Sequence, residues 1–256
     1  MIILDELGFV EKMIKEKTFG SNYVPLKNLV LLSKYYYYLG HSTREVKKLL
    51  IDICRKVDTN FNLTTQGWKI TLSIKESKKR RLRIPISIAI TVSELEKIRE
   101  IDDYNLEKVL FTFLIYAKYL KYNNTLIHPK SRPRLLGLFY CNEKLTNIFS
   151  VAKVDVSKSR RIEMAHILYL SGYIDATRFG GYNIKYVFED SSEAFTIDKY
   201  DDLVLYYLRW RGEQVSTCSC GRLFMKKSPT HIYCPVCSKR IRKERTKERV
   251  ERFRKK

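Results

Sequence analysis

The apolar positions of the chain recur mainly with the spacing of an α-helix. Residues 25–40, PLKNLVLLSKYYYYLG, form an apolar stretch that ends on a glycine, as helices commonly do. The next stretch begins with S-T-R-E at Ser42–Glu45, which is the spacing of a capping box. It continues with apolar residues from Val46 to Ile53 on one face. The pattern therefore predicts two consecutive helices with a tight turn between them.

Two less regular amphipathic segments flank this pair of helices. One lies within residues 1–20, and the other carries Trp68 and Leu72. The consecutive tyrosines Tyr35–Tyr38 point in four directions around a helix, so packing in the core and at its rim explains them better than base stacking. We expect residues 1–77 to form a helical domain.

A run of five positive charges, Lys78–Arg83 (KKRRLR), follows this domain. Two interpretations remain open for it: a solvated linker between domains, or an arm that follows phosphates. Either interpretation places a domain boundary before residue 84.

The second predicted domain spans residues 84–200. Thr91–Glu94 repeats the capping-box spacing, and residues 105–120 are apolar on most sides, which predicts a central buried helix. Further on, residues 142–152 and 158–172 have helical patterns with the short turn KVDVS between them.

A β-hairpin is predicted next, because residues 173–179 and 182–189 alternate in polarity around the pair Gly180–Gly181. Helix, turn, helix and hairpin is the order of a winged helix-turn-helix. The stretch I-x-x-L-x-G-x-I that starts at Ile167 resembles the end of the recognition helix in many bacterial winged-helix proteins.

This resemblance implies that the helix over residues 158–172 lies in the major groove of DNA. Its first turn would read base edges, and the hairpin would touch the backbone or the minor groove. A winged helix that contacts another protein is the alternative. The predicted contacts to nucleic acid are Lys158, Ser159, Arg160, Arg161 and Arg178.

The charge of the chain narrows the class of partner. The 256 residues include 49 Lys and Arg against 28 Asp and Glu, a net charge of +21. Such a surplus favours a polyanion, and nucleic acid before an anionic membrane. No stretch approaches 18 uninterrupted apolar residues, and the opening MIILDELGF has two acids where a signal peptide needs basic residues. We expect a cytoplasmic protein that does not bind a membrane.

Four of the six cysteines form two close pairs, Cys218-x-Cys220 and Cys234-x-x-Cys237, separated by 13 residues. Two such turns can direct four thiolates to one tetrahedral Zn²⁺. The first pair has one spacer residue in place of the usual two, so His231 is an alternative ligand to Cys218. Metal-free thiols in a small core, or redox chemistry, are the other interpretations.

This segment resembles small bacterial and phage zinc fingers of the form Cys-x-x-Cys-Gly-x-x-Phe, followed by Cys-x-x-Cys and a basic helix. The resemblance covers about the last 40 residues and implies a structural Zn²⁺, but it does not specify a partner. The matching residues are Cys220, Gly221, Phe224, Cys234 and Cys237.

The tail over residues 238–256 carries 11 basic residues against three glutamates, a net charge of +8. Good helix formers predict a helix, but Ile241, Val250 and Phe253 do not form a continuous apolar stripe, so little of it can be buried. It is either a solvated, frayed extension or a basic helix that lies along phosphates. The predicted contacts are Lys239, Arg240, Arg242 and Lys243.

Together these patterns predict a mainly α (α+β) protein with three parts: a helical domain, a winged helix-turn-helix, and a zinc finger with its basic tail over residues 213–256. The helix–Gly–helix layout of residues 25–76 is similar to a small helical domain that follows primase and replication-protein cores in phages and plasmids. The order of segments resembles uncharacterised proteins of Gram-positive bacteria and their phages. Neither resemblance supplies a catalytic motif.

The chain has no phosphate-binding glycine loop, no H-E-x-x-H and no G-x-S-x-G motif. The pairs Asp102–Asp103 and Asp201–Asp202 are of the kind that a two-metal nuclease uses, but adjacent side chains point apart. We therefore expect a non-enzymatic DNA-binding protein of a phage or mobile element, acting in replication initiation or transcriptional regulation. Host or phage replication or transcription proteins are further expected partners. The alternatives are a protein–protein effector, such as an inhibitor of host machinery or an assembly factor, and an RNA-binding protein.

Overall fold

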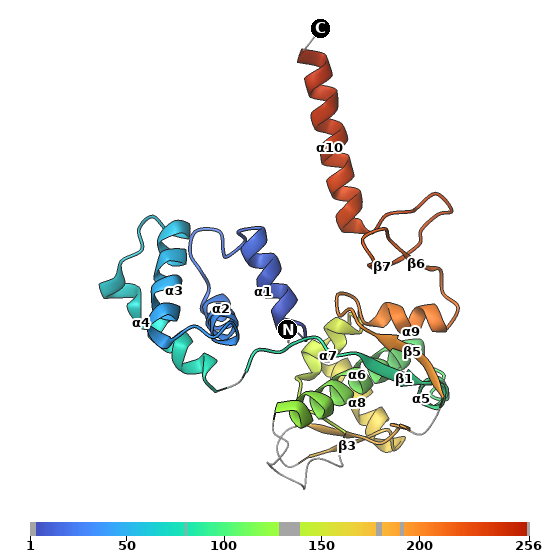
Figure 1. Ribbon diagram of the computed structural model, residues 1–256. Coiled ribbons are helices and arrows are strands. Elements are labelled where there is room, and N and C mark those ends of the chain that lie inside the picture. Colours follow the sequence, from blue (N-terminus) through green and yellow to red (C-terminus); the bar gives the residue numbers. More distant parts are fainter. Residues whose placement is uncertain (1–3, 80, 128–138, 178–180, 190–191, 255–256) are drawn as a thin grey trace. The chain divides into compact units, whose positions relative to one another are not determined.

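The computed structural model describes residues 4–79, 81–127, 139–177, 181–189 and 192–254. The protein is mainly helical with small antiparallel sheets, which confirms the predicted class at that level (Figure 1). It divides into two compact units, unit 1 (Met1–Pro85) and unit 2 (Ile86–Lys256). The division lies next to the predicted boundary between residues 77 and 84, and the cysteine-rich segment belongs to unit 2.

Unit 1 is built from helices around an apolar cluster that includes Leu29, Leu32, Val46, Leu50 and Ile70. The predicted capping box is present: the Ser42 side chain accepts from the Glu45 amide, and the Glu45 carboxylate accepts from the Ser42 amide. Tyr35 to Tyr37 pack against the cluster, as predicted for the tyrosine run. The helices are α1 (Glu6–Lys15), α2 (Leu26–Tyr38), α3 (Thr43–Val57) and α4 (Leu63–Ser77).

The end of the basic run Lys78–Arg83 is tied to α1. The amide of Arg83 donates to the Glu6 carboxylate at 2.9 Å, and the amide of Leu7 donates to the Arg83 carbonyl at 3.2 Å. Glu6 is buried and also pairs with Lys34 at 2.9 Å. The backbone at the C-terminal end of the run is therefore part of unit 1. Both interpretations of its charged side chains, a solvated linker and an arm that follows phosphates, stay open.

The core of unit 2 is the long helix α6 (Tyr104–Ile127), whose side chains from Val109 to Ala117 are almost completely buried. This confirms the predicted central helix. A two-stranded antiparallel sheet and a short helix pack against it, namely β1 (Ile88–Thr91), β5 (Glu193–Ile197) and α5 (Val92–Arg99).

A buried ion pair joins these elements. Lys118 on α6 donates to the Glu94 carboxylate and to the carbonyl of Ala89, each at 2.7 Å. Glu94 also closes the predicted capping box with Thr91 and accepts from the amide of Phe188 at 3.1 Å. A charged pair in an apolar core needs such additional hydrogen bonds, because burial removes both groups from water.

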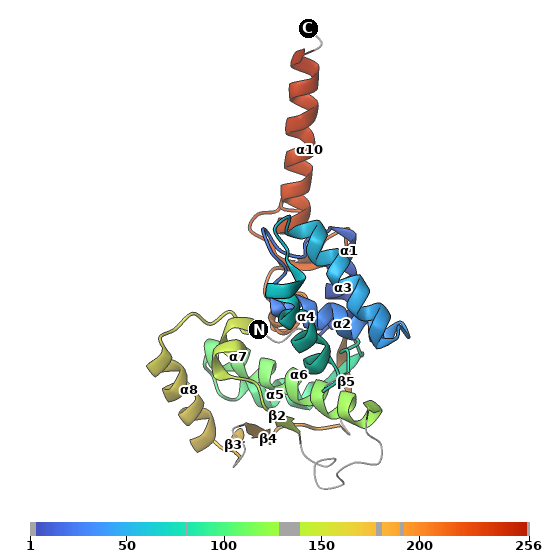
Figure 2. The same ribbon diagram turned by 90° about the vertical axis from the view of Figure 1, so that its left-hand side faces the viewer.

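Two helices and a three-stranded sheet follow α6, as Figure 2 shows. The helices are α7 (Leu145–Val151) and α8 (Lys158–Leu170), in close agreement with the predicted ranges. The sheet has the strand order β2-β4-β3, so the first strand pairs with the last. Its strands are β2 (Tyr140–Cys141), β3 (Ile174–Ala176) and β4 (Tyr182–Ile184), shorter than the predicted hairpin strands.

The chain then forms α9 (Val204–Trp210), which packs on α6, and the hairpin of β6 (Val215–Thr217) and β7 (Leu223–Met225). The last helix, α10 (Pro235–Arg254), begins inside the second cysteine pair. The hairpin contacts α9, so this short helix connects the cysteine-rich segment to the core of unit 2.

Candidate metal centre and basic surfaces

Two turns bring the sulfur atoms of Cys218, Cys220, Cys234 and Cys237 within 4.8 Å of one another. The Sγ atoms of Cys220 and Cys234 are 3.7 Å apart. Zn–S bonds of about 2.3 Å in a tetrahedron place sulfur atoms about 3.8 Å apart. The donor set therefore fits a tetrahedral metal ion in both chemistry and size, and these residues could bind one.

The first turn continues the β6–β7 hairpin. The amide of Cys218 donates to the Arg222 carbonyl at 2.8 Å, and the amide of Gly221 donates to the Cys218 carbonyl at 2.7 Å. Gly221 has a φ of +80°, a backbone conformation that side chains disfavour. This left-handed residue lets the chain reverse directly after Cys220, so one spacer residue is enough to place both sulfurs at the cluster.

The second turn coincides with the start of α10. Pro235 takes the first helical position, where its missing amide hydrogen costs nothing. The amide of Cys237 donates to the Cys234 sulfur at 3.5 Å. An amide hydrogen bond and the positive end of a helix dipole both favour the thiolate that a metal ligand must be.

Hydrogen bonds shift the pKa values of two thiols of the cluster in opposite directions. Hydrogen bonds from the backbone amides of Cys234 and Cys220 lower the pKa of Cys218 to about 6. The pKa of Cys237 is raised to about 12, because its thiol is hydrogen-bonded to the sulfurs of Cys220 and Cys234. Four adjacent thiolates repel one another, and a bound divalent ion removes that repulsion.

His231, the alternative ligand, does not join the sulfur cluster. Its ring packs on Phe224 with centroids 4.9 Å apart, and its Nδ1 accepts from the Lys227 amide at 3.3 Å. Phe224 is buried and, with Tyr233, forms the small apolar contact of this segment. We call residues 215–237 the cysteine hairpin; its apolar contact is too small to hold it folded without further support.

No protein-family model, curated protein or solved structure matches this chain. The resemblances drawn from sequence motifs therefore stay expectations. Among the described residues, no helix combines the length and the apolar character needed to cross a membrane.

Helix α10 is exposed along its length. Every described side chain from Ser238 to Phe253 is exposed except Ile241, which is half-buried, and Phe253 is 83% exposed. A helix of this composition has no apolar face to bury. It is therefore held by its attachment to the cysteine hairpin and by its own backbone hydrogen bonds.

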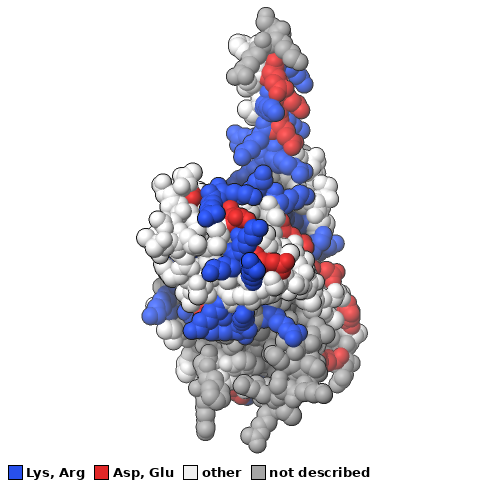
Figure 3. Space-filling model, turned by 60° about the vertical axis from the view of Figure 1, so that its left-hand side comes forward, with Lys and Arg blue, Asp and Glu red and all other residues white. Residues whose placement is uncertain are grey.

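The charges of α10 are segregated around its axis. Lys239, Arg240 and Lys243 share one face, because residues three and four apart lie on the same side of a helix. The three glutamates, Glu244, Glu248 and Glu251, line up about a quarter turn away, since each residue advances about 100°. Figure 3 shows acidic side chains along one side of this helix beside many Lys and Arg side chains. Arg242 and Thr246 extend the basic face.

The predicted contacts on α8 lie in its exposed first turn. Ser157 caps the helix by accepting from the Arg160 amide at 3.2 Å, and Lys158, Ser159 and Arg160 are exposed. Arg160 pairs with Glu163 at 2.6 Å, and Nε of Arg161 donates to the Ser157 carbonyl at 3.4 Å. Arg178, the predicted contact of the hairpin, lies outside the described residues.

The exposed face of α8 also carries apolar residues that sequence reasoning missed. Ile162 is 56% exposed, Tyr169 49% and Leu170 70%. Met164, Ala165 and Leu168 fill the opposite, buried face. The signal was available in the sequence, because with Met164 and Leu168 buried, helical spacing sends Ile162 and Tyr169 outward.

Three of the four aspartates in the two pairs make contacts within the protein. Asp103 caps α6 by accepting from the amides of Asn105 and Leu106, each at 2.9 Å. Asp201 pairs with Arg222 at 3.3 Å, and Asp202 pairs with Lys153 at 2.5 Å. These contacts fix the loops that carry the aspartates. The pair of Asp201 with Arg222 also links the segment before α9 to the cysteine hairpin.

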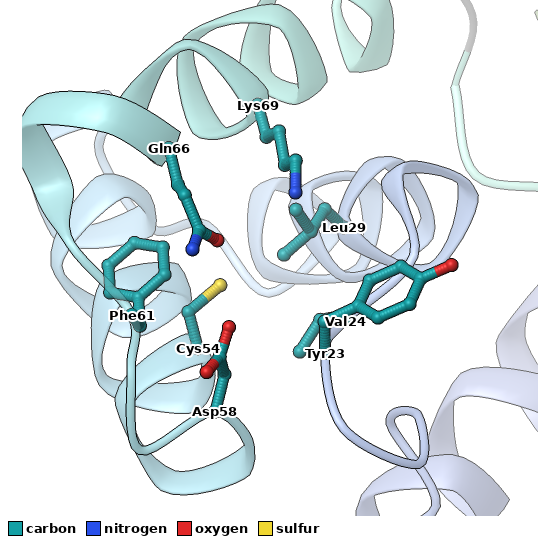
Figure 4. A pocket seen from close by; sticks show the side chains of 8 residues that line it. All are labelled: Tyr23, Val24, Leu29, Cys54, Asp58, Phe61, Gln66 and Lys69. Atoms are coloured by element: carbon teal, nitrogen blue, oxygen red, sulfur yellow. The ribbon is translucent and has the colours of Figure 1, made fainter.

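A small cavity in unit 1 is lined by polar groups, among them Asp58, Gln66 and Lys69 beside the Cys54 thiol (Figure 4). Its volume is about 10 Å³, which is room for about one water molecule. Burial raises the pKa of the Cys54 thiol to about 11, so this thiol stays protonated at neutral pH. Cys54 belongs to the apolar cluster of unit 1, which confirms the prediction of a core thiol.

Proposed function

We propose that this protein binds nucleic acid, with duplex DNA preferred, and that α10 supplies most of the affinity through contacts to phosphates. The observation that carries this proposal is the exposed, charge-segregated helix α10, anchored at its N-terminal end by four thiols. A basic face without an apolar stripe cannot pack into an apolar core. It does match the phosphate backbone, where each neutralised phosphate releases counterions.

The metal in this proposal is Zn²⁺, bound by Cys218, Cys220, Cys234 and Cys237 as a structural zinc finger. Four thiolates are the ligand set typical of structural zinc, and they leave no position for a catalytic water. The spacing of the sulfur atoms supports this assignment. The ion would fix the first turn of α10 relative to the β6–β7 hairpin, and so direct the basic helix.

In this proposal, α8 recognises the base sequence of the DNA. The order α6–β2–α7–α8–β3–β4 and the strand order β2-β4-β3 are those of a winged helix, which supports this proposal. In that fold the exposed first turn of α8 enters the major groove, where Arg160 or Lys158 can contact guanine. Adjacent arginines diverge by about 100°, so one of Arg160 and Arg161 is expected at a base and the other at a phosphate. The resemblances drawn from sequence motifs favour a phage or mobile element as the source. They also favour a role at DNA in replication initiation or transcriptional regulation.

The proposal is tested with a full-length variant in which Lys239, Arg240 and Lys243 are changed to Gln. The matched control changes Lys12, Lys15 and Lys17 to Gln and so removes the same charge from the region of α1. Binding to a random duplex is measured over a range of salt concentrations. Each lost phosphate contact reduces the salt slope, log K against log salt concentration, by about 0.9.

We expect the α10 variant to weaken duplex binding and flatten the salt slope, while the control changes both far less. Equal effects of the two variants would mean that overall charge, and not α10, attracts the polyanion. Tighter binding of structured RNA than of duplex DNA by the unmodified protein would replace DNA by RNA as the partner.

A second candidate function rests on the apolar side of α8. Ile162, Tyr169 and Leu170 expose more apolar surface than base reading at the first turn requires. This favours a protein partner, the effector function considered from sequence. Changing Ile162 and Leu170 to Ser distinguishes the two, because DNA affinity should persist if only the first turn touches DNA. If alanine at Arg160 and at Arg161 leaves DNA binding unchanged, α8 does not read DNA and the protein partner becomes the leading candidate.

A further inference from the structure

Unit 1 exposes two large aromatic side chains that share one lysine. Trp68 is 58% exposed and Tyr23 is 55% exposed. The ammonium of Lys69 lies 5.6 Å from the centroid of the Tyr23 ring and 5.9 Å from that of the Trp68 ring. Figure 4 shows Lys69 and Tyr23 at the small cavity of this unit. Most tyrosines of α2 pack against the core instead, and the ammonium of Lys78 lies 5.8 Å from the centroid of the Tyr37 ring.

The exposed stripe of α4 continues from Trp68 to further cations. Thr71, Lys75 and Lys78 follow Trp68 at helical spacing, and all are exposed. Lys75 lies two turns from Trp68, a distance of about 10 Å along the helix axis. Beyond Lys78 the chain enters the basic run that ends at Arg83.

Acidic groups near this stripe are occupied by contacts within the protein. Glu76 pairs with Lys79 at 2.7 Å, and Asp58 beside the cavity accepts from the Asn60 amide at 2.9 Å. Residues 1–85 contain 17 Lys and Arg against 8 Asp and Glu, a net charge of +9. Residues 86–237 contain 21 against 17, a net charge of +4. Unit 1 therefore carries a strong positive charge of its own, apart from α10.

We propose that this surface, made of Tyr23, Trp68, Lys69, Lys75 and Lys78, binds single-stranded nucleic acid. Exposed rings stack on unpaired bases, and the lysines along α4 follow the phosphates of the same strand. Cations next to the rings add to stacking and do not depend on base identity. The site lies on unit 1, whereas the cysteine hairpin and α10 belong to unit 2, and the proposal does not rest on their proposed function.

The chemistry of the stripe favours a single strand over the other polyanions. In a duplex the base faces are stacked inside, so Trp68 and Tyr23 could not reach them. An anionic membrane requires an apolar face that enters the lipid, whereas the exposed neighbours of Trp68 one turn away on α4 are Thr64, Thr65 and Thr71. An unpaired strand uses both the rings and the charges.

The test uses Trp68 as its own reporter. The chain has two tryptophans, so the full-length variant Trp210→Phe leaves Trp68 as the only indole. Its fluorescence is titrated with an oligothymidine of about 12 nucleotides, within the range of site sizes for such surfaces. The same titration is run with an abasic strand of equal length, a blunt duplex and anionic lipid vesicles.

We expect saturable quenching by oligothymidine, and binding at least about fivefold weaker for the abasic strand and the duplex, as the loss of one stacked base implies. In the same background, Tyr23→Ala should weaken quenching by oligothymidine about fivefold or more. Lys75→Glu should also weaken it, while the charge-matched control Lys12→Glu on α1 should change it little. The side chains of Tyr23, Lys75 and Lys12 are all exposed, so we expect these three substitutions to preserve the fold.

Quenching of equal strength by the abasic strand or the duplex would overturn the proposal, because bases would then not stack on this surface. A blue shift of Trp68 fluorescence with vesicles, and no quenching by oligothymidine, would assign the surface to a membrane. Equal effects of Lys75→Glu and Lys12→Glu would mean that the overall charge, and not this surface, attracts the strand. The readout is local to unit 1. A protein whose α10 fails to bind duplex would still show it, so this test is separable from that of the proposed function.

Discussion

The long helices α6 and α10 differ in almost every respect except length, at 24 and 20 residues. Side chains of α6 from Val109 to Ala117 are buried, whereas nearly all described side chains of α10 are exposed. Neither helix shows the one-sided apolar stripe of an ordinary surface helix. A helix that is apolar on all sides is stabilised by the protein around it. A helix that is polar on all sides gains little from its own chain, and this leads us to propose an external partner for α10.

Removal of the metal should give the largest difference between the two helices. Binding of structural zinc contributes on the order of 10 kcal/mol to such small segments. We expect Cys220→Ser, or a chelator, to release the proposed zinc and to unfold the cysteine hairpin and the start of α10, while α6 stays folded. Metal content and circular dichroism measure the two effects, and Cys54→Ala serves as the control that keeps the metal.

Thiol labelling also tests whether the cysteines of the hairpin hold a metal ion. Burial raises the pKa of Cys54 to about 11 and that of Cys141 to about 12, so both stay protonated and unreactive at neutral pH. The cysteines of the hairpin should react only after chelator is added. Rapid labelling of Cys141 in the native protein, or of the hairpin cysteines before chelation, would contradict this description.

A matched pair of valines tests the difference in burial. Val109 on α6 is fully buried and Val250 on α10 is 45% exposed. We expect Val109→Ala to lower the free energy of unfolding by roughly 2–3 kcal/mol through lost burial and a cavity. Val250→Ala should change it by no more than about 0.5 kcal/mol. Denaturant unfolding measures both, and similar losses would show that α10 packs against a core.

The smallest expected effect concerns the first turn of α8. Glu163 pairs with Arg160 at the surface and would lie near phosphates in the proposed complex. Glu163→Gln should free the arginine and remove a repulsive charge, which strengthens duplex binding by up to about 1 kcal/mol. Glu100→Gln breaks a similar exposed pair with Lys97 on α5 and is the control. Weaker binding by Glu163→Gln would contradict the placement of this turn at DNA.

Local rules account for what the sequence predicted correctly. The capping boxes at Ser42 and Thr91 and the apolar composition of α6 depend on neighbours within one or two turns. The sulfur cluster follows from two short turns, and the left-handed Gly221 lets the chain reverse after a single spacer residue. Each of these features depends on a stretch of only a few residues.

The missed features depend on contacts between distant segments. Strand β1 pairs with β5, with Ile88 opposite Ile197, and neither is long enough to alternate clearly. Strand β2 has two residues, and the seven-residue helix α9 is defined by packing on α6. The exposure of Trp68 could be inferred only in part, because it depends on which face of α4 meets α2 and α3.

Hydrogen exchange of α10 with and without duplex DNA tests the central claim most directly. In the free protein the amides of α6 should exchange slowly and those of α10 rapidly, because α10 has no packed face. On adding duplex DNA, protection should rise in α10, most strongly from Lys239 to Thr246, and stay unchanged in α6. Binding of duplex DNA with no change in the exchange of α10 would contradict the account.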